Sequence, residues 1–443
     1  MNEPQGRRPG TDKGAGGEAA TELRIQALRA INELGADAWN ECANPGWDSC
    51  SKIKPAGETD KATDQAHDGA AQAQEPVEPR PFNPFISYAF LSALEDSGSV
   101  GSRTGWQAQH LVVTTLDGQL LGAAPCYAKS HSRGEYVFDR GWAEAYERAG
   151  GSYYPKLQVA VPFTPATGPR LLVAPGPRAD VARQGLAAGL IELCRIGDAS
   201  GVHVTFATEA ECDLLGQRGF LQRTDQQFHW ANSNYATFDD FLTALSARKR
   251  KTIKRERRDA LAANDITVHW LTGEALTESI WDAFFEFYMD TGSRKWGRPY
   301  LTRSFYSLVG ERMRDQILLV MAKRAGRWIA GAINFIGSNT LFGRHWGAVE
   351  QHPFLHFELC YYQAIDYAIA HKLDFVEAGA QGEHKIARGY MPKTTHSAHY
   401  IADPGLRRAI ADYLVRERAY VEAAGTELAT LAPYRKDLVL DED

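Results

Sequence analysis

The hydrophobic pattern of the chain repeats one order of predicted elements. Residues 106–131 alternate in two apolar runs that meet at Asp117-Gly118, which predicts a β-hairpin. An apolar pattern with helical spacing follows over residues 179–201, and a continuous apolar run over 202–208 predicts a buried strand. This part of the chain therefore predicts a hairpin, a helix and a strand in succession.

The second part of the chain repeats this order. Residues 316–337 predict a hairpin that turns at Ala325-Gly326, and residues 340–350 predict the next strand. A long helix is expected over 355–372, and another strand over 374–380. The repeat predicts an α/β fold with two similar halves, although a fold does not by itself assign a function.

Composition and pattern suggest where these halves begin and end. Residues 1–20 are polar and rich in glycine, as expected of a disordered tail. We expect a helix of the first domain over residues 21–42, with Thr21 as its N-cap, and a low-complexity insertion over residues 43–81. The remaining predicted boundaries are a first domain at 82–235, a second domain at 236–425 and a C-terminal tail at 426–443.

Length, composition and net charge indicate a globular protein with two domains. A chain of 443 residues with 44% hydrophobic and 23% charged residues suits two globular domains. The net charge of −6 requires that any polyanion meet a local basic patch. Neither a secretory signal nor an apolar run of about 20 residues is visible, so we expect a cytoplasmic protein without a transmembrane segment. The six cysteines form no CxxC pair, and we expect no metal and no permanently bound cofactor.

The segment EAGAQGEHKIARGY carries the densest set of reactive side chains. It follows a predicted strand, and polar groups just past such a strand lie where open α/β sheets bind ligands. Amide formation needs a base for the attacking amine, and Glu377, Glu383 or His384 could serve. Three further side chains could hold the substrate: Gln381, Lys385 and Arg388. The alternative is a salt-bridged polar loop.

Two neighbouring segments add candidates. In GRHWG, Arg344 and Trp346 are expected on one face of a strand as substrate contacts, and His345 on the other face as a possible base. In the helix that begins near His356, Glu358 lies in the first turn, where it could act as a catalytic residue or simply stabilise the helix N-terminus.

A basic segment, ARKRKTIKRERRDAL, precedes the second predicted hairpin. At helical spacing it has an apolar stripe and a basic face made of Arg248, Lys251, Arg255 and Arg258. Such a face could meet tRNA, a nucleotide sugar or lipid phosphate. It could equally be a solvated helix surface.

Long blocks of this sequence resemble a family of Fem-like N-acyltransferases, also described as peptidoglycan biosynthesis/recognition proteins, whose fold is that of the GNAT acyltransferases. The resemblance covers roughly residues 82–420. The blocks that carry it are residues 129–150, 153–172, 343–347, 356–369 and 377–392. It implies two tandem GNAT-like domains with mixed central sheets.

The resemblance also implies an activity and further site residues. It implies transfer of an acyl or aminoacyl group to an amine, with acyl-coenzyme A or aminoacyl-tRNA as co-substrate and a small molecule or cell-wall precursor as acceptor. The coenzyme A signature (Q/R)xxGx(G/A) is absent from residues 347–356, which counts against that donor. In the first half the resemblance suggests five substrate contacts: Lys129, His131, Glu135, Tyr136 and Arg170.

Two rival functions stay open at this point. The chain could be a non-catalytic module that recognises a cell-wall precursor or a phosphorylated metabolite. It could also be a peripheral protein that docks on anionic lipid through residues 248–258. The sequence does not determine the oligomeric state.

Overall fold

A computed structural model describes residues 22–47, 80–261, 265–296, 299–379 and 382–435. The tail expected over residues 1–20 and most of the insertion expected over 43–81 lie outside these ranges. Near the two ends of that predicted insertion, the indole of Trp47 donates a hydrogen bond of 2.7 Å to the carbonyl of Arg80. The two ends of the inserted segment therefore lie together at one place on the surface.

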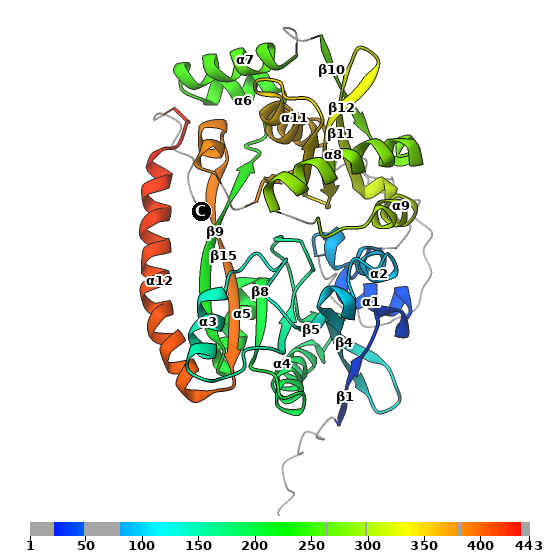
Figure 1. Ribbon diagram of the computed structural model, residues 1–443, viewed down its shortest axis with the longest axis vertical. Helices are drawn as coiled ribbons and strands as arrows, with labels where there is room; N and C mark the ends of the chain where they lie inside the picture. Colours follow the sequence, from blue (N-terminus) through cyan, green and yellow to red (C-terminus); the bar gives the residue numbers. More distant parts are fainter. Residues whose placement is uncertain (1–21, 48–79, 262–264, 297–298, 380–381, 436–443) are drawn as a thin grey trace, which may run out of the picture.

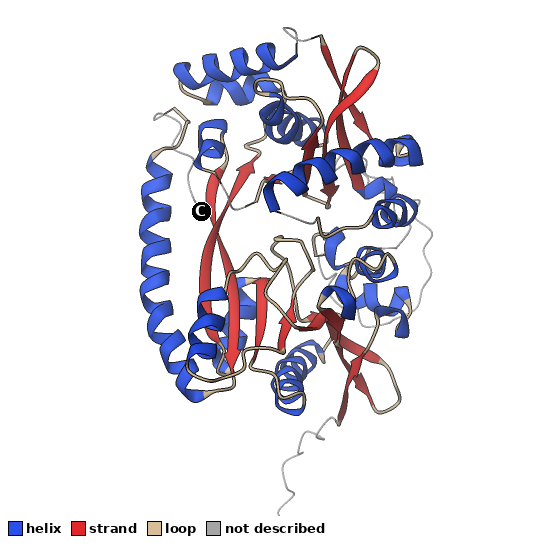
Figure 2. Cartoon of the chain, viewed as in Figure 1, coloured by secondary structure: helices blue, strands red, loops and turns tan. Residues whose placement is uncertain are grey.

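The N-terminal half runs to the end of β9 (Figures 1 and 2). Its elements are β1 (Leu23–Leu28), α1 (Ala36–Ala43), α2 (Tyr88–Asp96), β2 (Trp106–Ala108), β3 (His110–Thr115), β4 (Leu120–Ala124), β5 (Cys126–Lys129), α3 (Arg140–Arg148), β6 (Lys156–Val159), β7 (Leu172–Val173), α4 (Ala179–Ile196), β8 (Gly201–Ala207), α5 (Glu209–Gln217) and β9 (Leu221–Ala231).

The C-terminal half begins with two helices and holds the long helix α12 at its end. Its elements are α6 (Phe238–Ala244), α7 (Ala247–Leu261), β10 (Ile266–Leu271), α8 (Glu278–Trp296), α9 (Arg303–Arg312), β11 (Ile317–Arg324), β12 (Arg327–Ile336), β13 (Thr340–Ala348), α10 (Leu355–Phe357), the π-helical turn η7 (Glu358–Tyr362), α11 (Gln363–Ala370), β14 (Phe375–Glu377), the 3-10 helix η8 (Glu383–Arg388), β15 (Met391–Ile401) and α12 (Pro404–Thr430).

One large sheet joins the two halves. Within the described residues, eleven strands follow the order β10-β11-β12-β13-β14-β9-β15-β8-β6-β5-β2, and four others form a separate sheet, β1-β3-β4-β7. Strand β9 of the N-terminal half pairs with β14 and β15 of the C-terminal half. Figure 1 shows β9 and β15 running side by side between the halves, with α12 along them. The halves therefore share strands rather than sitting as separate units.

Each half contains a parallel strand pair that brackets a helix. Strands β6 and β8 pair in parallel on either side of α4, and β13 and β14 pair in parallel on either side of α10, η7 and α11. The expected hairpins precede these units, with turns at Gly118 and at Ala325-Gly326, where all three residues have positive φ. The predicted fold class, a mixed α/β protein whose two halves repeat one order of elements, is confirmed.

The helix predicted over residues 21–42 is partly wrong. Residues Leu23–Leu28 form the strand β1, which pairs antiparallel with β3, and only Ala36–Ala43 are α-helical. Apolar residues at alternate positions pack against α4, where a Cβ on Gly189 would lie 2.8 Å from Ile25. This close approach of a helix to the strand is a tertiary contact that the local pattern does not reveal.

The C-terminal tail predicted over residues 426–443 is also wrong for its described part. Helix α12 continues to Thr430, and the chain beyond it packs on the C-terminal half. The hydroxyl of Tyr434 donates to the carbonyl of Gly389 at 2.8 Å, and the amide of Arg435 donates to the carbonyl of Ala244. These contacts anchor the chain at the C-terminal end of α12.

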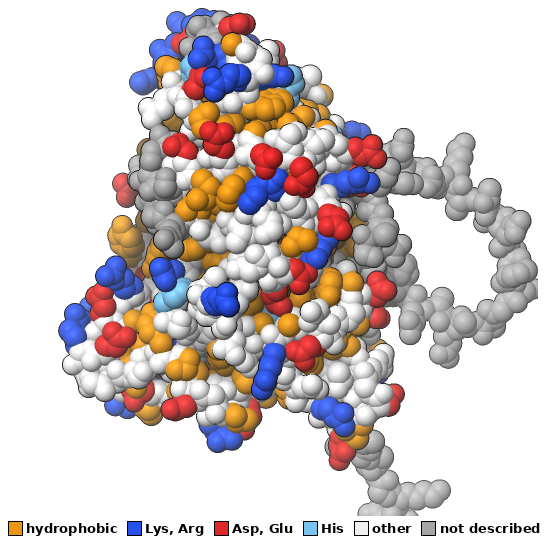
Figure 3. All heavy atoms as spheres, turned by 45° about the vertical axis from the view of Figure 1, so that its right-hand side comes forward, with side chains coloured by type: hydrophobic (Ala, Val, Ile, Leu, Met, Phe, Trp, Pro, Cys, Tyr) orange, Lys and Arg blue, Asp and Glu red, His pale blue; other side chains and the backbone are white. Residues whose placement is uncertain are grey.

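The surface gives no sign of a membrane span. None of the described helices is long and apolar enough to cross a bilayer. Figure 3 shows lysine, arginine, aspartate and glutamate side chains interspersed over one face of the molecule. That face carries no single-signed charged field.

Candidate active site

Glu377 ends β14 at the point where the two halves meet. It lies opposite His229 of β9 in the sheet register, and Phe342 of β13 flanks it on the other side. Its Oε1 is 3.9 Å from His229 Nε2, and its Oε2 is 3.9 Å from Arg344 Nη2. Oε2 is buried and has no hydrogen-bond partner in the described structure. A buried carboxylate oxygen that is left unpaired is costly, which marks the position as a functional candidate.

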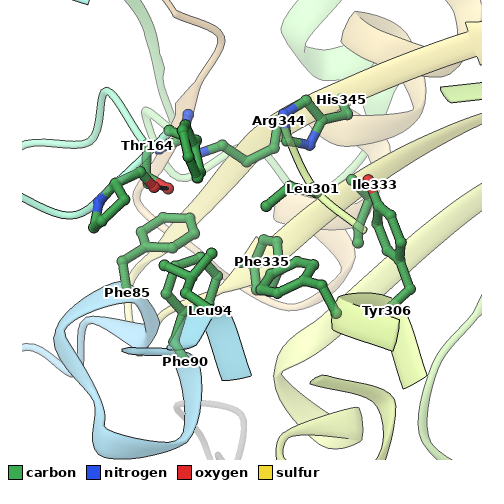
Figure 4. A pocket seen from close by; sticks show the side chains of 13 residues that line it. Phe85, Phe90, Leu94, Thr164, Leu301, Tyr306, Ile333, Phe335, Arg344 and His345 are labelled. Atoms are coloured by element: carbon green, nitrogen blue, oxygen red, sulfur yellow. Dashed lines mark hydrogen bonds between the residues drawn. The ribbon is translucent and has the colours of Figure 1, made fainter. Parts of the chain in front are cut away.

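A β-bulge places Arg344 beside this carboxylate. Between β12 and β13 the register moves from Ala332↔Trp346 to Asn334↔Gly343, so β13 carries one extra residue. As a result Arg344 lies over the ring of Phe85, with 4.6 Å between guanidinium carbon and ring centroid. Figure 4 shows Arg344 reaching from its strand toward Phe85 and Thr164 of the N-terminal half.

The bulge changes the predicted distribution of side chains on β13. Strict alternation put Arg344 and Trp346 on one face and His345 on the other, and the structure contradicts this. His345 packs on the ring of Tyr288 from α8, with 5.0 Å between ring centroids, on the side of the sheet that also holds Phe85. Trp346 packs on His356 at 5.1 Å, within the cluster on the opposite side.

Burial shifts the pKa values of Glu377, Arg344 and His345 at this junction. Burial raises the pKa of Glu377 to about 7, although the cations Arg344 and Arg170 partly oppose the shift. Burial likewise lowers the pKa of Arg344 to about 10 and that of His345 to about 4. Glu377 is therefore a carboxylate whose pKa lies close to neutrality, as a general base requires.

Two cavities border Arg344. A cavity of about 100 Å³ opens between β13 and the helix that follows it. Its lining includes Asn334, Arg344, His345, Trp346, His356, Cys360, Tyr361 and Ala378. A second, of about 10 Å³, lies toward the N-terminal half between Phe85, Phe163 and Arg344 (Figure 4). Gly343 and Ala378, which directly follow the paired residues Phe342 and Glu377, line the larger cavity, whereas Glu377 itself does not line it. We name it the Arg344 cavity.

Glu358 does not line the Arg344 cavity. It is fully buried in η7, and its carboxylate accepts hydrogen bonds from Arg257 at 2.9 and 3.1 Å and from Gln363 at 2.7 Å. Arg257 also binds Asp366 at 2.6 Å. These contacts tie α7 to the helix beyond β13, and they favour a structural role for Glu358 rather than a catalytic one.

A lysine within the segment after β14 binds the backbone of that same segment. Lys385 donates to the carbonyl of Gly379 at 3.0 Å, and burial lowers its pKa to about 8. His384 is exposed, and its Nε2 lies 3.1 Å from the hydroxyl of Tyr361, which lines the Arg344 cavity. Of the other predicted residues, Gln381 lies outside the described residues, as does the side chain of Glu383.

Arg388 connects this segment to the basic helix. Its Nη2 binds Glu256 of α7 at 2.8 Å, its Nη1 donates to the carbonyl of His384 at 2.7 Å, and its guanidinium lies 3.5 Å from the ring centroid of Phe357. The hydroxyl of Tyr362 also binds Glu256. Glu256, which lies within the basic segment, is therefore buried and internally paired.

Helix α7 confirms the predicted basic helix and shows how its cations are distributed. Arg248, Lys251, Arg255 and Arg258 are all exposed, while Ile253 packs inward. Only Arg248 of those four lines a cavity with residues of η8.

The predicted residues at the start of the 129–150 segment form a buried charged cluster. Lys156 binds both Glu135, at 2.6 Å, and Asp139. Lys129 lies 3.6 Å from Glu135 and 3.5 Å from the ring centroid of Trp106, and burial lowers its pKa to about 7. Neither Lys129 nor Glu135 lines the Arg344 cavity. Their contacts stabilise the loop that leads to α3.

Three other predicted residues of the N-terminal half have different environments. Tyr136, next to Glu135, has φ +62 and lies close enough to Arg344 for the two to interact electrostatically. His131 contacts the carbonyl of Thr104 at 2.9 Å. Arg170 is buried and donates to the carbonyls of Ala166, Gly168, Pro169 and Thr205, which fixes its own loop. Of these three, Tyr136 is the one that the structure brings to Arg344.

Sequence reasoning missed several residues of the site. His229 belongs to β9, about 150 residues before Glu377 in the chain, and no local motif connects them. Asn334 of β12 and Cys360 and Tyr361 of η7 also line the Arg344 cavity. Only the partner strands and the π-helical turn make them neighbours, and π-helical turns frequently occur at functional sites. In the described part of the chain, no three His, Cys, Asp or Glu side chains are grouped so as to hold a metal ion.

Comparison with known proteins gives a family. The model of the FemAB-like family, described as peptidoglycan biosynthesis/recognition, matches residues 62–436. No curated protein sequence matches the chain.

Solved structures with a similar arrangement are distant in sequence. "Crystal structure of FemX" has a TM-score of 0.46 and 12% identity, and the match covers 73% of this chain and 94% of that one. Another structure, "The structure of L-PGS from Bacillus licheniformis", has a TM-score of 0.45 and 9% identity, with 73% of this chain and 95% of that one covered. A tandem GNAT protein from the clavulanic acid biosynthesis pathway has a TM-score of 0.42 and 13% identity, with 86% and 99% covered.

Proposed function

Because this chain belongs to the FemAB-like family, we propose that it is an N-acyltransferase that joins an acyl or aminoacyl group to an amine at the Arg344 cavity, with Glu377 as the general base. The single observation that carries the proposal is the state of Glu377. It is buried, has a pKa of about 7 and keeps Oε2 without a hydrogen-bond partner, 3.9 Å from Arg344.

Each step of amide formation has a residue suited to it. The amine nitrogen attacks the acyl carbonyl carbon, a new C–N bond forms, and the bond to the donor's oxygen or sulfur breaks. Glu377 takes the proton that the amine loses, and at neutral pH a carboxyl with a pKa of about 7 can both accept and release that proton. The leaving group departs with a proton, which Glu377 can return to it.

Arg344 is suited to the charge that develops during the attack. Its Nε and Nη2 are buried and have no acceptor in the described structure, while Nη1 donates to the carbonyl of Gly343 at 2.9 Å. Two unpaired N–H groups on one edge of a guanidinium can bind the oxyanion of the acyl group or a carboxylate of the substrate. The low dielectric of the junction strengthens that interaction.

The donor and the acceptor follow from the family rather than from the cavity alone. We propose acyl-coenzyme A or aminoacyl-tRNA as co-substrate, and a small molecule or cell-wall precursor as the acceptor. Helix α7, through Arg248, Lys251, Arg255 and Arg258, is the proposed contact for tRNA phosphates. The missing coenzyme A signature between β13 and α10 favours the aminoacyl donor.

The test is a donor screen with matched variants of two carboxylates. Purified protein is incubated with acyl-coenzyme A and aminoacyl-tRNA donors and with amine acceptors, and amide products are measured. Glu377→Gln should reduce the rate at least 100-fold, because the general base is lost. Asp374→Asn, an exposed residue next to β14, is the matched control and should retain the rate. Equal rates in the two variants would remove Glu377 from the mechanism.

The rival is a non-catalytic module that recognises a cell-wall precursor. The same screen separates the two, because tight binding of a precursor with no product from any donor would favour the module. The unpaired Glu377 oxygen argues for chemistry, since a site that only binds gains nothing from a carboxylate with a pKa near neutrality.

A further inference from the structure

A third cavity lies between the basic helix and the segment after β14. It has a volume of about 300 Å³ and is separate from the Arg344 cavity. Its lining comprises Arg248, Lys249, Thr252, Ile253, Glu256, Tyr362, Ala387 and Arg388. It therefore joins two segments that are more than 120 residues apart in the chain.

The charges in this cavity do not balance. Arg248, Lys249 and Arg388 are cationic and only Glu256 is anionic, which leaves an excess of two positive charges. Glu256 is paired inside the protein, because its Oε2 accepts from Arg388 at 2.8 Å and from the hydroxyl of Tyr362. Neither Arg248 nor Lys249 has a carboxylate within ion-pair distance among the residues that the structure describes.

The floor of the cavity holds an unsatisfied donor. The side chain of Arg388 is only 7% exposed, and its Nε has no hydrogen-bond partner in the described structure. Its other two nitrogens are occupied by Glu256 and by the carbonyl of His384. Arg388 is thus held in place by two hydrogen bonds, and its Nε is the nitrogen that has no partner among the described residues.

The first turn of α7 adds to the positive potential. Arg248 and Lys249 are the second and third residues of this 15-residue helix, where backbone N–H groups lack intrahelical acceptors and the helix dipole favours an anion. The dipole, the two free cations and the buried Nε all favour the same kind of ligand.

We propose that this cavity binds the terminal phosphate or pyrophosphate of a soluble ligand. A phosphate monoester carries a charge of about −1.5 to −2 at neutral pH, which matches the excess of two positive charges. A phosphodiester within a nucleic acid carries one negative charge per phosphate and matches less well. A planar guanidinium with a free N–H is also well suited to phosphate oxygens.

The position of the cavity relates it to the proposed chemistry. Tyr361 lines the Arg344 cavity and the next residue, Tyr362, lines this one, so both open beside the π-helical turn η7. A phosphorylated substrate held here could extend its reactive end toward Arg344. This last step rests on the proposed function, whereas phosphate binding itself does not.

The experiment is a titration of the full-length protein with inorganic pyrophosphate, followed by calorimetry at fixed ionic strength. The test variant is R248A/K249A, because both side chains line the cavity. The matched control is K251A/R258A, which removes the same two charge types from the same helix at exposed positions outside the cavity. Arg388 is left intact because its loss would leave Glu256 buried without its cation.

The proposal expects saturable binding that weakens at least tenfold in R248A/K249A and less than threefold in K251A/R258A. Glu377→Gln should bind pyrophosphate as the unaltered protein does, so a failed transferase assay does not decide this result. Equal weakening in both double variants, or no saturable binding, would overturn the proposal. Binding of phosphatidic acid vesicles or of an RNA strand without a terminal phosphate, in place of pyrophosphate, would also overturn it.

Discussion

Nη2 of Arg344 lies 3.9 Å from Oε2 of Glu377, and neither atom has a hydrogen-bond partner in the described structure. Two opposite charges at this separation attract but do not form a hydrogen bond. Both atoms are buried at the junction of the halves, where unpaired polar atoms are destabilising. Such a pair is expected where a substrate supplies the missing partner, and the predictions on these two residues follow from it.

The raised pKa of Glu377 predicts a pH-dependent gain in stability for Glu377→Gln. The usual pKa of 4.5 rises to about 7 in the folded protein, so the folded state binds more protons than the unfolded state between these values. The stabilising contribution of protonated Glu377 is fully present below pH 4.5 and is lost as the pH rises toward 7. At pH 8, Glu377→Gln should raise the free energy of unfolding by up to about 3 kcal/mol, from 1.36 kcal/mol per pKa unit.

Urea unfolding of both proteins at pH 5 and pH 8 measures this difference. The gain should be large at pH 8 and small at pH 5, where Glu377 is still mostly protonated. A difference of the same size at both pH values would contradict the raised pKa.

Replacing Arg344 predicts a shift in the titration of its neighbour. Arg344 lowers the pKa of Glu377 electrostatically, in opposition to the larger effect of burial. In Arg344→Met the carboxyl should therefore titrate above pH 7, because the cation that opposes the effect of burial is removed. Infrared spectroscopy of the carboxyl band, with Glu377→Gln as the reference, follows this titration. An unchanged or lower midpoint would show that the two groups do not interact.

Glu358 should prove structural. Its carboxylate pairs with Arg257 in a fully buried position, and loss of one partner of a buried pair typically costs about 3–5 kcal/mol. Glu358→Ala should lower the unfolding free energy by that order, while the rate per folded molecule is retained. The exposed pair between Arg140 and Glu144 provides the control, because Glu144→Ala should change stability by about 1 kcal/mol or less. Loss of turnover in folded Glu358→Ala would instead assign it to catalysis.

We predict that Lys156 is essential for the stability of the N-terminal half. Burial disfavours the charge on both Glu135 and Asp139, and the Lys156 ammonium offsets this, most strongly at Asp139, whose pKa it holds below its usual value. Lys156→Met leaves both carboxyls buried without this partner and should destabilise the protein by about 3–5 kcal/mol. Lys254→Met, which removes an exposed ion pair with Asp239, is the comparison and should have a small effect. Thermal unfolding that shows similar losses in both variants would contradict this role.

Local patterns predicted those elements whose determinants are local. The hairpins at Asp117-Gly118 and Ala325-Gly326 were predictable because their turns need residues that tolerate positive φ. The strand at Leu23–Leu28 was not predictable, because the spacing of its apolar residues also fits a helix. The packing of α4 against this segment is a tertiary contact that favours the strand.

The site was predictable in its residues but not in its geometry. Glu377 and Arg344 stood out from their segments, yet the extra residue in β13 that brings Arg344 to Glu377 is a property of strand register. His229 lies opposite Glu377 because β9 pairs with both β14 and β15. These strands are far from β9 in the sequence, so no local pattern predicts the pairing. The burial of Glu256 could not be predicted from the sequence, because its partners, Arg388 and Tyr362, belong to other elements.

The most direct test of the account is the pH dependence of a single turnover. With the donor and acceptor found in the screen, the rate of amide formation should rise with pH and level off above about 7, as Glu377 loses its proton. Glu377→Gln should be at least 100-fold slower and should lack this rise, whereas Asp374→Asn should follow the unaltered protein. A Glu377→Gln variant that keeps both the rate and the rise would contradict the assignment of Glu377 as the base.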